Sequence, residues 1–416
     1  MQELTLIFSM CFLVGGVMRL FWGFLTDRFS RKNMLAINKI GTAAAFFLYG
    51  FIPNGSGMLG FAMAMLFTVI RELFSGFEVM CMSYLDDTIE EEKRSAAFGL
   101  AFMFQQMFYM AACIVGAFLL RFIWHEYFFI IGGSGIVIGI IMAVKGKESK
   151  RASERKELKG LLKLDALVYD YKITKETLKK TILSRTNFVV FIEGLFTQLM
   201  LIIPFLLFFA YVESPPYNLS PEVAALIAVV FGAPGSIIGS MVFAKASDKW
   251  GKKNVKNRIY VIIFSLICLY LICTAFFFIP LTGMTLEQGK NFFFFLSFPA
   301  HWFFSFLMLF GYMLTGLFGI NQKPLIQKLN LPEAQGLVSS ANSFLEIISV
   351  GIAGLVSGAI LVFLNNNYQV TSLVLLLMAL IGASLWFVAL KNFEPDIERV
   401  SSILKERAGE IEKNEN

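Results

Sequence analysis

The chain has 416 residues, of which 57% are hydrophobic and only 16% charged, with a formal net charge of +6 at pH 7. Soluble globular proteins carry about 45–50% apolar and about 25% charged residues, so this composition excludes an ordinary water-soluble fold. A net positive charge also suits nucleic-acid binding, but the distribution of the basic residues along this chain argues for a membrane protein instead.

Apolar stretches long enough to cross a bilayer follow one another along the chain. They predict an all-α polytopic membrane protein with eleven spans, at residues 4–25, 34–53, 57–85, 95–120, 122–144, 188–212, 222–244, 258–280, 292–320, 336–364 and 369–390. The first stretch is too long and too poorly flanked to be a cleaved signal peptide. All five cysteines lie in these stretches at spacings that suit neither a metal site nor a redox pair, so we expect no metal and no cofactor.

The segments between the spans alternate between basic and charge-poor. One set carries 31 of the 36 Lys and Arg residues, and the other set carries two. The positive-inside rule places the basic set in the cytoplasm, which puts the C-terminus inside and the N-terminus outside. We therefore expect a monomeric, multi-pass protein of the cell membrane that contacts lipid and binds no nucleic acid.

A long basic segment divides the chain into two helical halves. Residues 1–144 form a predicted bundle of five spans, residues 188–390 form one of six, and residues 391–416 form a cytoplasmic tail. Between the bundles, residues 145–187 are a cytoplasmic linker in which leucines from Leu158 to Leu167 recur at roughly helical spacing. This spacing favours an amphipathic helix at the membrane surface, and a plain solvated linker is the alternative.

A short motif occurs once in each half. The first span ends in a turn of the form small-xxx-Asp-basic-x-small-basic-basic, and the seventh span ends in the same form 221 residues later. Its residues are Gly23, Asp27, Arg28, Arg31 and Lys32 in the first copy, and Asp248, Lys249, Gly251 and Lys252 in the second. The small residue allows close helix approach, and the Asp can accept hydrogen bonds from the amides that begin a neighbouring helix. The contacts of such a turn can hold one conformation of a transporter and break in another. The occurrence of the motif in both halves indicates an internal duplication, which is typical of secondary transporters.

At these residues the sequence resembles the major facilitator superfamily, whose signature loop reads G-x-x-x-D-R-x-G-R-R/K. The first copy departs from it at Ser30, and the second copy departs at Ala244 and Lys249. The resemblance covers the whole chain and implies two bundles packed around a central substrate site. It also implies that residues 4–25 correspond to the second helix of the family. On this correspondence the family's first helix is missing, so the chain has five plus six helices instead of the usual six plus six. The favoured explanation is that the given sequence omits an upstream start.

Residues 71–78 resemble a second pattern, the R-x-x-x-G-x-G-E of Spinster-type transporters. Arg71 and Glu78 match it, whereas Ser75 and Phe77 stand in the glycine positions. This resemblance implies an amphipathic substrate of the lysolipid or sphingoid kind.

Charged groups at membrane depth cost roughly 2.5–3.5 kcal/mol each, so each of them needs a partner or a function. Arg71 and Glu78 are seven residues apart, about two helical turns, so we expect them to lie on one helical face and line the same cavity. We expect Glu78 to bind a substrate headgroup or a coupling proton, and a structural salt bridge is the alternative reading. The full set of predicted substrate-binding or coupling residues is Arg71, Glu78, Glu193, Arg19, Glu346 and Gln105.

These features together predict a secondary transporter that moves a small organic solute by alternating access, with protons or sodium as the coupling ion. A non-transporting receptor or scaffold on the same fold is the main alternative. An intramembrane lipid enzyme would need a catalytic constellation that two distant histidines do not supply, so we expect no enzyme. A phosphate-binding glycine loop is also missing from the sequence, which argues against an ATP-driven pump.

Overall fold

The structure is a computed structural model, and it describes residues 2–53, 55, 57–90, 93–119, 123–148, 150–158, 169–172, 174, 179, 181 and 184–413. These residues form helices joined by turns and loops, with no strand among them. The all-α prediction is therefore confirmed for the described part of the chain.

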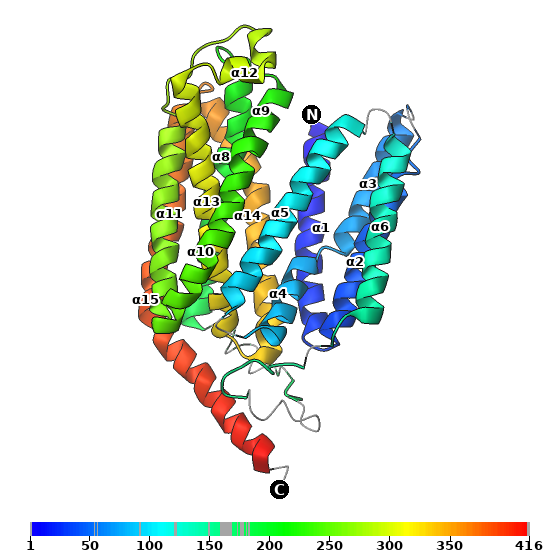
Figure 1. The fold of residues 1–416 in the computed structure, drawn as a ribbon, viewed down its shortest axis with the longest axis vertical. Helices are drawn as coiled ribbons and strands as arrows, with labels where there is room; N and C mark the ends of the chain where they lie inside the picture. Colours follow the sequence, from blue (N-terminus) through cyan, green and yellow to red (C-terminus); the bar gives the residue numbers. More distant parts are fainter. Residues whose placement is uncertain are drawn as a thin grey trace.

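The first half of the chain forms a group of helices on one side of the molecule (Figure 1). They are α1 (Gln2–Thr26), α2 (Arg31–Tyr49), α3 (Gly57–Leu73), α4 (Phe77–Thr88), α5 (Arg94–Leu119) and α6 (Trp124–Lys145). Ser30 begins α2 by accepting a hydrogen bond from the Asn33 amide, as N-cap serines do. Within this first bundle, α2 packs against α3 and α6.

The second half forms the other group. Its long helices are α8 (Arg185–Glu213), α10 (Ala233–Lys253), α11 (Lys256–Phe276), α13 (Pro299–Lys328), α14 (Gln335–Phe363) and α15 (Tyr368–Lys413). The π-helical turn η2 (Ala228–Gly232) joins α9 (Pro221–Ile227) to α10, and the shorter elements are η3 (Gln288–Lys290), α12 (Phe292–Phe295) and η4 (Pro332–Ala334). Within this second bundle, α8 packs against α14 and α15, and α13 packs against α10 and α11.

Two helix pairs form most of the contact between the bundles. Helix α1 of the first bundle packs along α14, and α5 packs along α10. We call this boundary the seam. The N-terminus and C-terminus lie at opposite ends of the helices (Figure 1).

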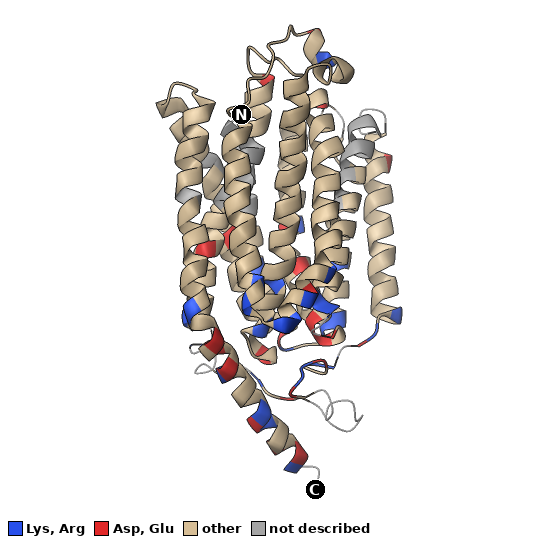
Figure 2. Cartoon of the chain, turned by 60° about the vertical axis from the view of Figure 1, so that its left-hand side comes forward, with Lys and Arg blue, Asp and Glu red and all other residues tan. Residues whose placement is uncertain are grey.

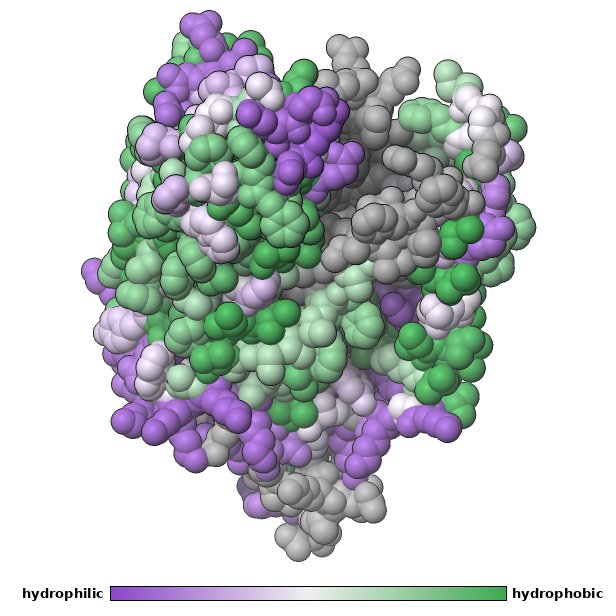
Figure 3. Space-filling view, turned by 45° about the horizontal axis from the view of Figure 1, so that its top comes forward, coloured by the Kyte–Doolittle hydropathy of each residue, from purple (hydrophilic) through white to green (hydrophobic). Residues whose placement is uncertain are grey.

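Seven helical segments of the described residues are long and apolar enough to cross a membrane, and the apolar segment Val14–Thr26 of α1 is shorter. A mainly hydrophobic surface separates hydrophilic residues at the two ends of the molecule (Figure 3). The end near the C-terminus also carries most of the Lys, Arg, Asp and Glu residues (Figure 2), and we call it the charged end. The chain is thus an integral, multi-pass membrane protein, and the total of eleven spans stays a prediction.

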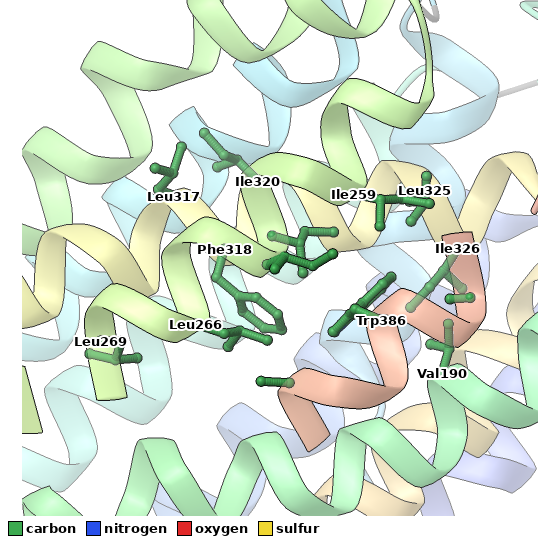
Figure 4. Packing of buried hydrophobic residues seen from close by; sticks show 14 of the residues in the cluster. Val190, Ile259, Leu266, Leu269, Leu317, Phe318, Ile320, Leu325, Ile326 and Trp386 are labelled. Atoms are coloured by element: carbon green, nitrogen blue, oxygen red, sulfur yellow. The ribbon is translucent and has the colours of Figure 1, made fainter. Parts of the chain in front are cut away.

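The core of the second bundle is built from side chains on α8, α11, α13 and α15 (Figure 4). Trp386, Ile259, Leu266 and Leu325 are completely buried in it. In a membrane, van der Waals packing of this kind holds helices together, because lipid tails are as apolar as the helix surfaces.

The structure adds detail to the predicted boundaries. The span predicted at 57–85 corresponds to one apolar segment, Gly57–Thr88, with a break between α3 and α4 at residues 74–76, and the span predicted at 292–320 is shifted to Pro299–Lys328. Within the predicted tail, α15 continues as a helix to Lys413. In the linker, Leu158 is buried against Val400 and Leu404 of α15, and the rest of the predicted amphipathic helix lies outside the described residues.

Candidate functional site

The Asp27 turn (residues 23–33) connects the first bundle to the second. The Asp27 carboxylate accepts hydrogen bonds from the amides of Gly336 at 2.9 Å and Leu337 at 2.8 Å, which lie in the first turn of α14. The first amides of a helix have no partner within the helix and carry the positive end of its dipole, so an anion is favoured there. The expected carboxylate–helix contact is therefore present in the structure.

Glycines make this contact possible. A Cβ on Gly23 would lie 2.6 Å from the carbonyl oxygen of Gly336, and a Cβ on Gly336 would lie 2.6 Å from Asp27 Oδ1. Both distances are far below van der Waals contact, so any side chain at either position would push α1 and α14 apart.

Burial changes the acidity of Asp27. Removal from water raises the pKa of its carboxyl group to about 7, against the lowering effects of the Arg31 charge and the two backbone hydrogen bonds. Arg31 is buried beside it, 2.6 Å from Asp87, and donates hydrogen bonds to the carbonyl oxygens of Ser83 and, at 3.1 Å, Pro332. The other predicted basic residues of the turn differ, because Arg28 is exposed over the Phe24 ring and Lys32 is only half-buried.

The Asp248 turn (residues 244–254) makes the reciprocal connection from the second bundle to the first. Asp248 accepts hydrogen bonds from the amides of Ser95 at 3.2 Å and Ala96 at 3.0 Å, in the first turn of α5. Arg258 of α11 lies 2.9 Å from the same carboxylate, and a Cβ on Gly251 would lie 2.5 Å from Arg258 Nε. The two turns are therefore related in structure as well as in sequence.

Sequence reasoning missed the basic residue that completes this second turn. Lys249 and Lys252 are exposed, and Arg258 is the buried partner that occupies the place of Arg31 in the first copy. Only its position at the start of a predicted span, among other basic residues, marked it in the sequence.

An ion-pair cluster spans the seam deeper in the molecule. Glu78 of α4 forms an ion pair with Lys323 of α13, and Arg19 of α1 lies 3.9 Å from the same carboxylate. The side chains are partly exposed, by 37% for Glu78, 29% for Lys323 and 24% for Arg19. Glu346 of α14 is half-buried and interacts electrostatically with Lys323 and Glu78. We call these four residues the seam cluster.

The break between α3 and α4 overturns one expected relation. Because the helix is interrupted at residues 74–76, Arg71 and Glu78 do not share a helical face, and Arg71 pairs with Glu72 at 2.5 Å instead. The Trp22 ring occupies the space beside Gly76, where a Cβ would lie 2.5 Å from Trp22 Cβ, and its Nε1 donates to the Leu73 carbonyl at 2.8 Å. Glu78 then lies in the first turn of α4, where the helix dipole stabilises its charge.

Lys323 is the central residue that sequence reasoning missed. The sequence favours a loop there, because the polar run Asn321–Lys323 precedes Pro324 and proline commonly ends a helix. In the structure α13 begins at Pro299 and continues through Pro324 to Lys328, which brings Lys323 into the seam.

The remaining predicted residues lie in different surroundings. Glu193 of α8 is completely buried inside the second bundle, 3.4 Å from Gln322 Nε2 and hydrogen-bonded to Thr197. Gln105 has an exposed side chain on α5 and, among the described residues, no hydrogen bond to the other predicted site residues.

A second network at the charged end ties the linker and α15 to the helices. Glu333, in the short helix η4 before α14, lies 2.8 Å from Arg407 Nη1 and accepts a hydrogen bond from Tyr169 of the linker at 2.8 Å. Burial and the nearby Glu333 charge raise the pKa of the Tyr169 hydroxyl, which keeps it a hydrogen-bond donor. Glu333 thus holds two segments far apart in sequence beside the Asp27 turn.

Comparisons with known proteins agree with this arrangement. A model of the Major Facilitator Superfamily matches residues 1–345. The fold is similar to the crystal structure of the human organic anion transporter MFSD10 (TETRAN), with 14% identity and a TM-score of 0.63 over 92% of this chain and 83% of that one. It is also similar to a bacterial homologue of the iron transporter ferroportin in the outward-facing state, with 14% identity and a TM-score of 0.64 over 92% and 88% of the two chains. A search of curated proteins found no match.

Proposed function

Because the chain belongs to the Major Facilitator Superfamily, we propose that it is a secondary transporter that moves a small organic solute by alternating access. The observation that carries the proposal is the pair of carboxylate–helix contacts across the seam. Asp27 binds the start of α14 and Asp248 binds the start of α5, so each bundle is held by an acid of the other at the charged end.

The charged end is the closed gate in this proposal, and it faces the cytoplasm, as the basic segments predict. Opening it requires the two bundles to rotate apart, which breaks the contacts of both turns and separates Glu78 from Lys323. Water then replaces these partners, so the net cost per hydrogen bond is modest, about 0.5–1.5 kcal/mol. A barrier built from several such contacts is small enough for a solute to shift the balance between the two states.

The seam cluster is the proposed substrate site. It contains two cations and two carboxylates that are partly exposed between the bundles, and they come from α1, α4, α13 and α14. A solute with an anionic or zwitterionic group can take the place of Glu78 beside Lys323 and Arg19, which would loosen the connection between the bundles. An amphipathic molecule of the lysolipid or sphingoid kind, coupled to protons, is the specific case that we carry forward from the sequence.

Uptake into proteoliposomes tests the proposal. The probes are acyl-labelled lysophosphatidylcholine and, as polar solutes, lactate, glutamate and glucose, each with and without an imposed pH gradient. We expect saturable uptake of one probe class that is lost in Lys323→Met. Lys290→Met serves as the matched control, because Lys290 is an exposed residue that pairs with the nearby Glu287.

Two results would contradict parts of the proposal. Uptake of polar solutes alone would remove the lipid-like substrate but keep the transporter. Thermal stabilisation by a probe that is never taken up would replace the transporter with a receptor on the same fold.

A further inference from the structure

Glu193 is a carboxyl group that the gate and the seam cluster do not use. It lies on α8 inside the second bundle with 0% of its surface exposed. The polar groups around its carboxyl are the Thr197 hydroxyl, Gln322 Nε2 at 3.4 Å and the indole N–H of Trp386, all of them neutral. Among the ion pairs of the described residues, none involves Glu193.

The helices around Glu193 do not supply a compensating positive charge. On α13 the nearest cation, Lys323, is paired with Glu78, and on α14 the facing charge is another carboxylate, Glu346. On α15 the facing residue is the buried Trp386.

The cations of the remaining neighbours are far along their helices. On α11 they lie at the charged end, where Lys256 pairs with Glu394 and Arg258 with Asp248. Helix α9 contacts the other end of α8, and its charged residue there is an acid, Glu222. Glu193 is therefore surrounded by neutral groups and like charge.

A buried carboxylate in such surroundings is strongly disfavoured, whereas the neutral acid fits the contacts that are present. The protonated carboxyl can donate to Thr197 Oγ1 while its other oxygen accepts from Gln322 Nε2. The Thr197 hydroxyl can in turn donate to a backbone carbonyl one turn earlier, a common arrangement for threonine inside a helix. Every polar atom of the neutral group then has a partner.

We infer that Glu193 is the proton-binding site of this protein. The inference rests on the proposed transport function and places the coupling proton at Glu193 rather than at Glu78, whose charge is stabilised by Lys323 and Arg19. The ligand of the site is a single proton, held as the neutral carboxyl group.

The position of Glu193 links this proton to the seam cluster. Gln322, which contacts Glu193, directly precedes Lys323 on α13. On α8, the next residue is Gly194, where a Cβ would lie 3.5 Å from Glu346 Cγ. A movement of α13 that separates Lys323 from Glu78 therefore also moves the hydrogen-bond donor of Glu193. Glu346 interacts electrostatically with Glu193 and belongs to the seam cluster, so it is the acid through which the proton can reach the seam.

Infrared spectroscopy of the full chain in lipid nanodiscs tests the site without any substrate. We expect the unaltered chain to show the carbonyl stretch of a protonated buried carboxyl group at neutral pH. Because Asp27 is also buried and has a pKa of about 7, the spectra are recorded in an Asp27→Asn background and compared as differences. The band should decrease in Glu193→Gln, which keeps the size and hydrogen bonding of the neutral acid, and be retained in Glu78→Gln. Glu287→Gln, at an exposed loop position, is the control. A band of unchanged intensity in Glu193→Gln, or the lack of such a band before that substitution, overturns the inference.

A transport measurement then separates the proton site from the transport function. In proteoliposomes, Glu193→Gln should lose accumulation driven by a pH gradient but keep exchange of labelled for unlabelled probe. Unchanged gradient-driven accumulation overturns the coupling role. An unaltered chain that moves none of the probes, but whose band decreases in Glu193→Gln, keeps the proton site and removes the proposed transport.

Discussion

The Asp27 turn allows a quantitative test of the gate. Asp27→Ala removes the acceptor of two amides at the start of α14, those of Gly336 and Leu337. An unsatisfied buried donor costs about 1–3 kcal/mol, while loss of the buried charge offsets part of that cost. We therefore expect the closed state to lose about 1–3 kcal/mol relative to the open state, a shift of about 5- to 150-fold in their ratio.

Distances between spin labels at the charged end measure this shift. Phe29 of the first bundle and Lys253 of the second are exposed, and labels carried there on unnatural amino acids leave the native cysteines untouched. Asp27→Ala should enlarge the fraction of molecules with a long distance. Asp27→Asn should stay near the unaltered protein, because an amide oxygen still accepts a hydrogen bond and carries no charge to bury.

Two outcomes would refute this reasoning. An unchanged distance distribution in Asp27→Ala would show that the turn does not hold the gate. Equal opening in Asp27→Ala and Asp27→Asn would show that charge, and not the hydrogen-bond acceptor, holds it. Asp170→Ala, a change at an exposed linker residue, controls for the loss of one negative charge.

Three further predictions concern pH, the seam cluster and the linker. The pKa of Asp27 is about 7 in the closed structure and near its ordinary value of 3.8 once water reaches it, so the closed state binds the proton more tightly. Its population should therefore rise as the pH falls from above 7 towards 4, and a label distance that lengthens on acidification would contradict this sign. Lys323→Met should lower the melting temperature more than the double variant Lys323→Met with Glu78→Gln does, because the single change leaves a partly buried carboxylate without its cation. Equal melting temperatures of the two variants would show that the ion pair does not contribute to stability. Arg407→Gln removes the cation beside the buried Glu333 and should speed proteolysis of the linker, and an unchanged cleavage rate would show that this contact does not hold the linker in place.

The sequence was sufficient for everything that depends on local composition. Apolar length predicted helices because a backbone in lipid must satisfy its own hydrogen bonds. The two Asp turns were visible because each is a contiguous motif, and their contact with helix amides follows from general electrostatics. The motif alone therefore identifies Asp27 and Arg31 as candidates, and both side chains are buried in the turn.

The partners of the charged residues could not be obtained in the same way. In the structure the pairing of Glu78 with Lys323 goes with a helix break at which Trp22 packs beside Gly76, and the apolar run 57–85 does not reveal this break. The pairing also required α13 to continue through Pro324 to Lys328, although a proline commonly ends a helix.

Glu193 shows the same contrast between what the sequence determines and what the tertiary structure decides. Its sequence position marked it as an acid at membrane depth, and the cost of burying a charge followed from that alone. Whether a cation, a neutral donor or water meets its carboxyl group was decided by how α8, α13 and α14 pack. Hydropathy reports how each segment interacts with lipid, whereas the partner of a buried charge is a contact between segments far apart in the chain, and only the tertiary structure fixes it.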